Sequence, residues 1–120
     1  MTRIAAFAIA AGTLFAAVPA HAQYGALAYD PDSRVWGRSY NQPSPRDADG
    51  VALSYCRSPG CRVVARTGPG QCGAIAAPSY GNGFRWATRP SRGAAEYAAV
   101  AGCQEQQGQY CHVVFAVCNE

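Results

Sequence analysis

The sequence contains no lysine and few charged residues of either sign, which limits the partners that it could attract. All ten basic residues are arginine, seven residues are acidic, and the formal net charge is +3. A protein that binds nucleic acid usually concentrates its basic residues in a patch or stripe on one face. The sequence shows no such concentration and therefore predicts no nucleic-acid partner.

Motifs for redox, hydrolytic, metal and nucleotide chemistry are missing as well. The sequence has no Cys-x-x-Cys pair and no Gly-x-Ser-x-Gly elbow. The cysteine spacings and the single histidine after residue 22, His112, do not match a zinc site. Residues 68–73 match Gly-x-Gly-x-x-Gly, but a strand is expected after them where a dinucleotide site needs a helix. We expect no metal and no cofactor.

The start of the chain has the order of a secretory signal. Arg3 gives a basic end, residues 4–18 are almost wholly apolar, and small residues lead to a cleavage site after Ala22. The apolar run is shorter than the roughly 20 residues that span a bilayer, and no later run is as long and apolar. We therefore expect residues 1–22 to be a signal peptide. Residues 23–120 are then one exported domain, periplasmic or extracellular, without a transmembrane segment.

The exported part divides into two similar halves, residues 23–71 and 72–120. Tyr-Gly-Ala-Leu-Ala at 24–28 matches Cys-Gly-Ala-Ile-Ala at 72–76, which is an offset of 48 residues. A segment that begins at serine and ends at cysteine twelve residues later recurs next, followed by a Cys-x-Val-Val motif. These landmarks keep their order in both halves. The sequence therefore predicts an internal repeat.

Each half predicts the order strand, strand, helix, strand. Ser44 and Ser91 are suited to cap the helices, which end near Cys56 and Cys103. The strands with defined bounds are residues 24–29, 34–40, 61–66 and 111–118. The predicted fold is α+β, with about six strands, two helices and a pseudo-twofold axis between the halves. Either one sheet or a partly closed barrel fits this pattern.

Six cysteines follow residue 22, and an even number in a short exported chain is typical of a disulfide framework. In each half one cysteine ends the helix and another begins the strand that follows. The simplest pairing that respects the repeat is Cys56–Cys61, Cys103–Cys111 and Cys72–Cys118.

The landmarks as a set resemble the bacterial domain-of-unknown-function family 4189. They are the Tyr-Gly-Ala-Leu-Ala opening, Val-Trp-Gly-Arg-Ser-Tyr, the Ala-rich helix ending in Cys, Cys-Arg-Val-Val and Cys-Gly-Ala-Ile-Ala. The resemblance covers residues 24–118. It implies export, disulfides and a doubled architecture. The family has no agreed activity, so the resemblance implies no catalytic residue.

Aromatic and arginine side chains on the second strand of each half are the candidate binding residues. Because side chains alternate along a strand, Trp36, Arg38 and Tyr40 share one face, and Phe84 and Trp86 take the equivalent face of the second half. Trp, Tyr and Arg are frequent anchors of binding surfaces. The competing interpretation places these aromatics in the core beneath solvated arginines.

These features predict a non-catalytic exported binding or interaction module. The expected partner is a protein, such as an inhibited enzyme or a host target, or a cell-envelope component. One alternative is a small secreted hydrolase that uses carboxylates. The acidic residues lie mostly in turns and helix starts, however, and no two of them stand out as a catalytic pair. The other alternative is a structural envelope protein.

Overall fold

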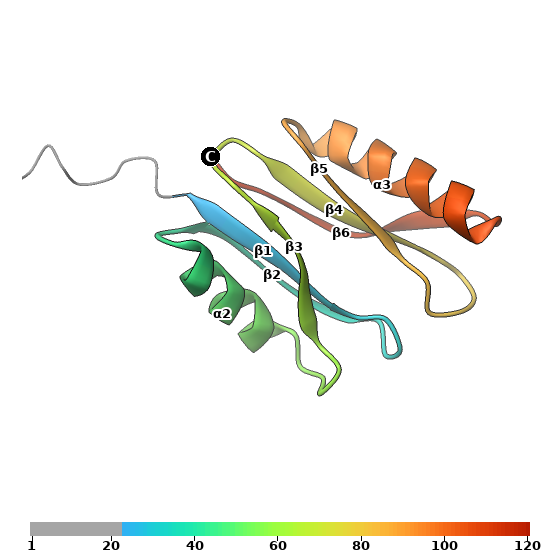
Figure 1. Ribbon diagram of the computed structural model, residues 1–120, viewed down its shortest axis with the longest axis horizontal. Coiled ribbons are helices and arrows are strands. Elements are labelled where there is room, and N and C mark those ends of the chain that lie inside the picture. The colour runs from blue at the N-terminus through green and yellow to red at the C-terminus, as the bar shows by residue number, and fades with distance from the viewer. Residues whose placement is uncertain (1–22) are drawn as a thin grey trace, which may run out of the picture.

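The computed structural model describes residues 23–120, and the signal peptide predicted for residues 1–22 lies outside them. The first half contains β1 (Tyr24–Asp30), β2 (Val35–Gln42), α2 (Pro45–Tyr55) and β3 (Arg62–Thr67). The second half contains β4 (Cys72–Pro78), β5 (Arg85–Arg89), α3 (Arg92–Gln107) and β6 (Cys111–Cys118). Both halves therefore follow the predicted order of strand, strand, helix, strand (Figure 1).

The strands form two separate three-stranded sheets, neither a single sheet nor a barrel. The first sheet has the order β2-β1-β3 and the second has the order β5-β4-β6, and the pairs in both are antiparallel. Equivalent strands of the two halves occupy equivalent places in their sheets. This arrangement agrees with the predicted α+β fold built from two tandem repeats.

Alternation along the central strands produces four layers in the order helix, sheet, sheet, helix (Figure 1). On β1, Ala26 and Ala28 face α2, while Leu27 and Tyr29 face the second sheet. The residues facing the helices are mostly alanine, so each helix backbone lies close to its sheet. The larger apolar side chains, including Ile75, meet between the two sheets.

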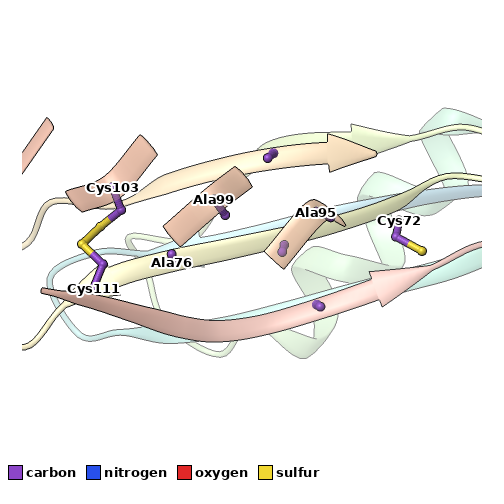
Figure 2. Close-up of a cluster of buried hydrophobic side chains, with 9 residues drawn as sticks. Cys72, Ala76, Ala95, Ala99, Cys103 and Cys111 are labelled. Carbon is purple, nitrogen blue, oxygen red and sulfur yellow. A yellow bond between two sulfur atoms is a disulfide. The ribbon is translucent and has the colours of Figure 1, made fainter. Parts of the chain in front are cut away.

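Alanine and cysteine form the contact between α3 and its sheet. Ala95 and Ala99 of α3 belong to one buried cluster with Ala76 of β4, and the Cys103–Cys111 disulfide closes one end of it (Figure 2). All these side chains are buried. The small side chains on both elements thus allow the helix to lie close to the strands.

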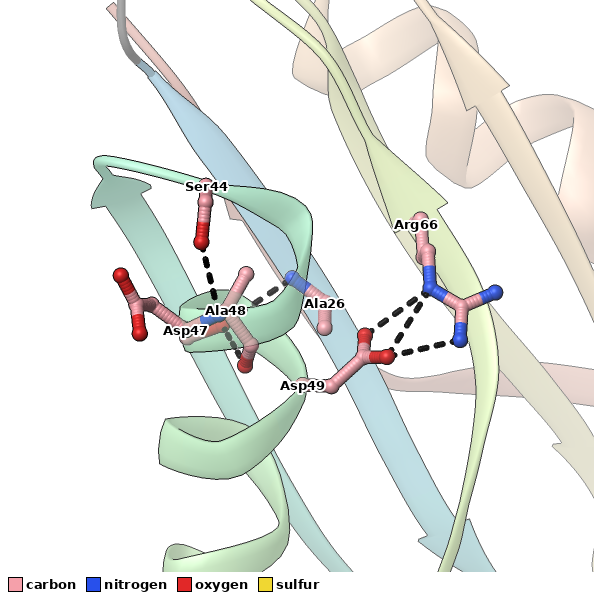
Figure 3. Close-up of polar contacts among 7 residues, drawn as sticks. Ala26, Ser44, Asp47, Ala48, Asp49 and Arg66 are labelled. Carbon is pink, nitrogen blue, oxygen red and sulfur yellow. Dashed lines mark hydrogen bonds and ion pairs between the residues drawn. The ribbon is translucent and has the colours of Figure 1, made fainter.

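Serine side chains fix the position of α2. The Ser44 hydroxyl accepts a hydrogen bond from the Asp47 backbone N–H at 3.1 Å, which caps the helix as predicted (Figure 3). The buried Ser39 hydroxyl donates to the Ala48 carbonyl at 2.7 Å and accepts from the Ala26 N–H at 3.1 Å. Ser39 thereby joins α2 to β1 at an irregular step in the β1–β2 pairing.

The three predicted disulfides are all present. They are Cys56–Cys61, Cys72–Cys118 and Cys103–Cys111. Two of them tie a helix end to the strand that follows. The third links the first residue of β4 to the last residue of β6, and the two Cα atoms are 4.0 Å apart.

The last residues of the chain join the second half to the first. The buried Asn119 side chain donates to the Thr67 hydroxyl at 2.7 Å and to the Gly68 carbonyl at 2.9 Å. Its amide oxygen accepts from the Asn41 N–H at 2.9 Å. These bonds hold the β2 end, the β3 end and the C-terminus in one place.

Candidate functional site

A groove follows the edge of the two-sheet sandwich where β2 lies beside β6. One part is a hollow of about 390 Å³ lined by Trp36, Gly37, Arg38, Tyr40 and Tyr55. The adjoining part is a hollow of about 270 Å³ lined by Arg38, Tyr40, Arg92, Ala116, Val117 and Cys118. Two residues line both hollows, so we treat them as one feature and call it the β2–β6 groove.

Alternation along β2 directs three of the predicted binding residues into this groove. Gly37 and Ser39 are buried, with Gly37 against the end of α2 and Ser39 bonded to it. Trp36, Arg38 and Tyr40 occupy the opposite face and line the groove. The shared face expected from the sequence is therefore the face that borders the second sheet.

Trp36 belongs both to the core and to the groove. Its ring stacks on Phe115 of β6 with centroids 4.5 Å apart and an angle of 7° between the planes. The Arg38 guanidinium carbon lies 5.5 Å from the Trp36 ring centroid, within cation–π range. Trp36 nevertheless keeps 38% of its surface exposed. Trp36 therefore contributes to the core, as the competing interpretation expected, and also leaves part of its ring exposed in the groove.

Tyr55 and Arg92 line the groove but carry no sequence signal that singles them out. Tyr55 is the last residue of α2 and is 62% exposed. Its place is fixed because the next residue, Cys56, is bonded to Cys61 at the start of the following strand. Arg92 begins α3 and forms an exposed ion pair with Glu96 at 3.2 Å. Two arginines thus line the groove, and no carboxylate is among its lining residues.

The other two predicted binding residues lie away from this groove. Phe84 packs edge-on against Tyr29, with centroids 5.2 Å apart, beside the core between the sheets. Trp86 is 46% exposed on β5, which lies beside β3 at the opposite edge from β2 and β6. The five residues therefore divide into a group of three in the groove and a group of two at the far edge.

Most acidic side chains of the described residues are engaged in structural contacts. Asp49 accepts hydrogen bonds from Nε and Nη2 of Arg66, a bidentate ion pair along one edge of the guanidinium, with a shortest distance of 2.7 Å (Figure 3). Asp32 accepts from the Asn82 side chain at 2.8 Å, between the turns of the two halves. Among residues 23–120, no three His, Cys, Asp or Glu residues gather as a metal ion would require.

The buried Asp30 carboxylate organises the loop between α2 and β3. It accepts hydrogen bonds from the hydroxyls of Ser58 and Ser33 and from the Asp32 N–H. Gly60 leaves room for it, because a Cβ there would lie 2.8 Å from the carboxylate. The Ser58 hydrogen bond foremost, and then that of Ser33, hold the pKa of Asp30 below its ordinary value, although burial acts in the opposite direction.

This lowered pKa makes Asp30 a source of acid sensitivity. A carboxyl whose folded pKa is depressed contributes stability that is fully present above its unfolded pKa of about 3.9 and is lost as the pH falls through its folded pKa. We expect Asp30→Asn to be less stable than the wild type at neutral pH, by a difference that shrinks as the pH falls below about 4. Urea unfolding at a series of pH values from neutral into the acid range measures this difference. Glu105→Gln, at an exposed helix position, is the matched control and should retain the wild-type profile.

No helix within the described residues has both the length and the apolar composition needed to cross a membrane.

The fold and groove define a small disulfide-stapled α+β protein made of one unit used twice. The chain belongs to the family described as Domain of unknown function (DUF4189), whose family model matches residues 24–118. This finding confirms the resemblance expected from the sequence.

Two mycobacterial relatives are similar to this chain. The uncharacterized protein Rv1813c of Mycobacterium tuberculosis is 39% identical over 83 residues, which cover 69% of this chain and 54% of that protein. The uncharacterized protein Mb1843c of Mycobacterium bovis matches to the same extent. The chain therefore spans about half the length of these curated relatives. The NMR structure of Rv1813c matches with a TM-score of 0.64 at 34% identity, covering 85% of this chain and 79% of that one.

Proposed function

We propose that this domain is a non-catalytic exported binding module that holds a protein or cell-envelope component in the β2–β6 groove. The observation that carries the proposal is the lining of the groove, where aromatic rings and arginines converge from β2, α2 and α3. Tyr40 and Tyr55 are 53% and 62% exposed, although both are anchored on regular elements. Rigid aromatic and arginine side chains of this kind supply most of the energy at binding surfaces.

Export is part of the proposal and has its own support. Residues 1–22 have the order of a secretory signal, and the cysteines of the described residues are all in disulfides. Disulfides persist in oxidising compartments such as the periplasm and the extracellular space. Recovery of the protein from either compartment with Gln23 as its first residue supports export, and retention in the cytoplasm argues against it.

A role without catalysis is supported by the positions of the acidic groups. The groove contributes two arginines and no carboxylate, whereas a glycosidase-like site needs two carboxyl groups on either side of its substrate. The acidic residues with the most defined contacts, Asp30 and Asp49, hold loops and strands in place.

Two exposed tyrosines allow the groove to be tested without disturbing the core. We expect Tyr40→Ala/Tyr55→Ala to retain the wild-type stability and to lose at least about 10-fold in affinity for the captured partner. The matched control is Tyr97→Ala, because Tyr97 is 78% exposed on α3 and is not among the residues that line the groove. Trp36 is unsuitable for this purpose since its stacking on Phe115 also supports the core.

The measurement compares capture by the three oxidised proteins from periplasm and culture medium, followed by titration of the captured component. Loss in the double variant together with retention in the Tyr97 variant supports the groove as the binding site. Equal capture by all three proteins contradicts it.

A further inference from the structure

We infer that the β2–β6 groove receives a short, extended, acidic segment of another polypeptide, which pairs as an added strand with the open edge of β6. This inference rests on the proposed function, and it names the chemistry of the partner. Three features of the molecule support it: the backbone that β6 presents, the position of Arg38, and the charge of the strand edges.

The end of β6 directs backbone groups toward the groove. Within residues 23–120, β6 is an outer strand of its sheet and pairs with β4 alone. The Cα atoms of Cys72 and Cys118 are 4.0 Å apart, which marks a pair without mutual hydrogen bonds. The N–H and C=O of Cys118 therefore point away from β4. The register is unbroken back to Ala116, so the same groups of Ala116 point the same way.

Arg38 occupies this edge in the free protein. Its Nη1 reaches across from β2 and donates to the Ala116 carbonyl, and Ala116 has no exposed surface. Covering an outer strand with a charged side chain is a common protection against uncontrolled strand pairing. Arg38 itself is exposed, so its side chain can move without disturbing the core.

An incoming acidic strand would replace this contact without leaving a polar group unpaired. A backbone N–H of the segment can donate to the Ala116 carbonyl in place of Arg38. The released guanidinium can then bind a side-chain carboxylate of the same segment, a charge-assisted and often bidentate contact. Arg92, on the other side of the groove, has an exposed ion pair with Glu96 that contributes little and can be redirected in the same way.

The remaining lining suits an alternating sequence. Side chains of a strand point to opposite sides in turn, so carboxylates that meet the arginines alternate with residues that face elsewhere. The rings of Trp36, Tyr40 and Tyr55 line the adjoining part of the groove and offer apolar contact to those alternate residues. The preferred segment therefore alternates acidic and apolar residues.

The charge of the outer strands argues against a second copy of this chain as the occupant. The outer strands of the two sheets are β2, β3, β5 and β6. Together they carry five arginines and no acidic residue. Because Arg38 already lies at the β6 edge, pairing β2, β3 or β5 of a second copy there would add further arginines beside it. An acidic segment from a different protein is complementary.

The test uses the oxidised full chain, labelled with ¹⁵N, and a capped peptide that alternates Glu and Val. We expect the amides of Ala116 and Cys118 to exchange more slowly with solvent when the peptide is bound. A Lys–Val peptide should bind at least about 10-fold more weakly, and N-methylation of alternate residues should remove binding. Arg38→Gln should weaken binding of the Glu–Val peptide by a similar factor. Arg62→Gln, on the outer strand β3, is the matched control and should leave binding of the Glu–Val peptide unchanged.

Each other outcome overturns a defined part of the inference. Equal binding of the two peptides overturns the preference for acid, and equal binding of the N-methylated peptide overturns strand pairing. If polygalacturonate binds while the peptides do not, the partner is an anionic polysaccharide, and the groove keeps its proposed function. Self-association of the chain in place of peptide binding makes a second copy the occupant. The proposed function itself fails only if Tyr40→Ala/Tyr55→Ala leaves capture of the natural partner unchanged.

Discussion

Replacing the Cys72–Cys118 disulfide by two alanines is expected to lower the free energy of unfolding by about 4 kcal/mol. The bridge joins residues 46 apart in sequence, so its loss frees a large loop in the unfolded chain. The other bridges span only 5 and 8 residues, and on the same loop-entropy argument they contribute about 2 kcal/mol each. Since domains of this size are stable by only about 5–15 kcal/mol, the loss amounts to roughly a quarter or more of the total stability.

Guanidinium unfolding without reductant, followed by circular dichroism, measures this loss. Cys56→Ala/Cys61→Ala is the matched control. It removes the same atoms, but the bridge that it deletes closes a much shorter loop. A loss that is equal in the two double variants would contradict the dependence on loop length. In that case the local packing of each bridge, and not the unfolded chain, would set its contribution.

The disulfide framework was accessible from the sequence because the repeat restricts the pairing. Cys56 and Cys103 end equivalent helices, and Cys61 and Cys111 follow at equivalent strand starts. Once these two local disulfides are assigned, only two cysteines remain, and the structure shows that they form the third disulfide. The same repeat, together with serine caps and alternating apolar residues, gave the order of the helices and strands. Local chemistry determines these features, so local patterns were sufficient to predict them.

The separation into two sheets depends on contacts that no local pattern contains. Trp36 stacks on Phe115, and Phe84, its equivalent in the repeat, packs on Tyr29, so both find their partner in the other half of the chain. Where one half has a large residue at such a position, the other half has a small one. Phe115, for example, corresponds to Ala65 in the repeat. This complementarity of large and small residues lets the side chains of the two sheets interlock. It can be recognised only when the two sheets are placed face to face.

The candidate site was predicted in part for the same reason. Alternation along β2 was sufficient to place Trp36, Arg38 and Tyr40 on one face. It could not reveal that this face borders β6, nor that Tyr55 and Arg92 come from helix ends to complete the lining. Phe84 and Trp86 are equivalent to residues of the groove in the repeat, but the pseudo-symmetry carries them to the opposite edge. Equivalence in sequence therefore did not mean proximity in space.

Gly37→Ala is the second substitution with a large expected effect, a loss of about 3 kcal/mol or more. A Cβ at Gly37 would overlap the Ala52 carbonyl oxygen and would lie 2.5 Å from the Cys56 nitrogen. Both atoms belong to the backbone at the end of α2, and the Cys56 N–H already donates to the Ala52 carbonyl at 3.1 Å. No side-chain rotation can relieve this clash, so the last turn of α2 must move away from β2.

The opposite result is expected when a methyl group is added on the exposed side of α2. Gly50 lies inside this helix, and a Cβ added to it would meet no heavy atom within 4 Å beyond the helix's own backbone. Gly50→Ala should therefore raise the free energy of unfolding by roughly 0.5–1 kcal/mol, through helix propensity alone. Chemical unfolding of the two variants measures the loss of stability expected for Gly37→Ala and the gain expected for Gly50→Ala.

Because Tyr55 moves with the end of α2, Gly37→Ala should also weaken binding in the groove, whereas Gly50→Ala should not. If Gly37→Ala were as stable as the wild type, the close approach of α2 to β2 would be wrong, and with it the position of Tyr55 in the groove.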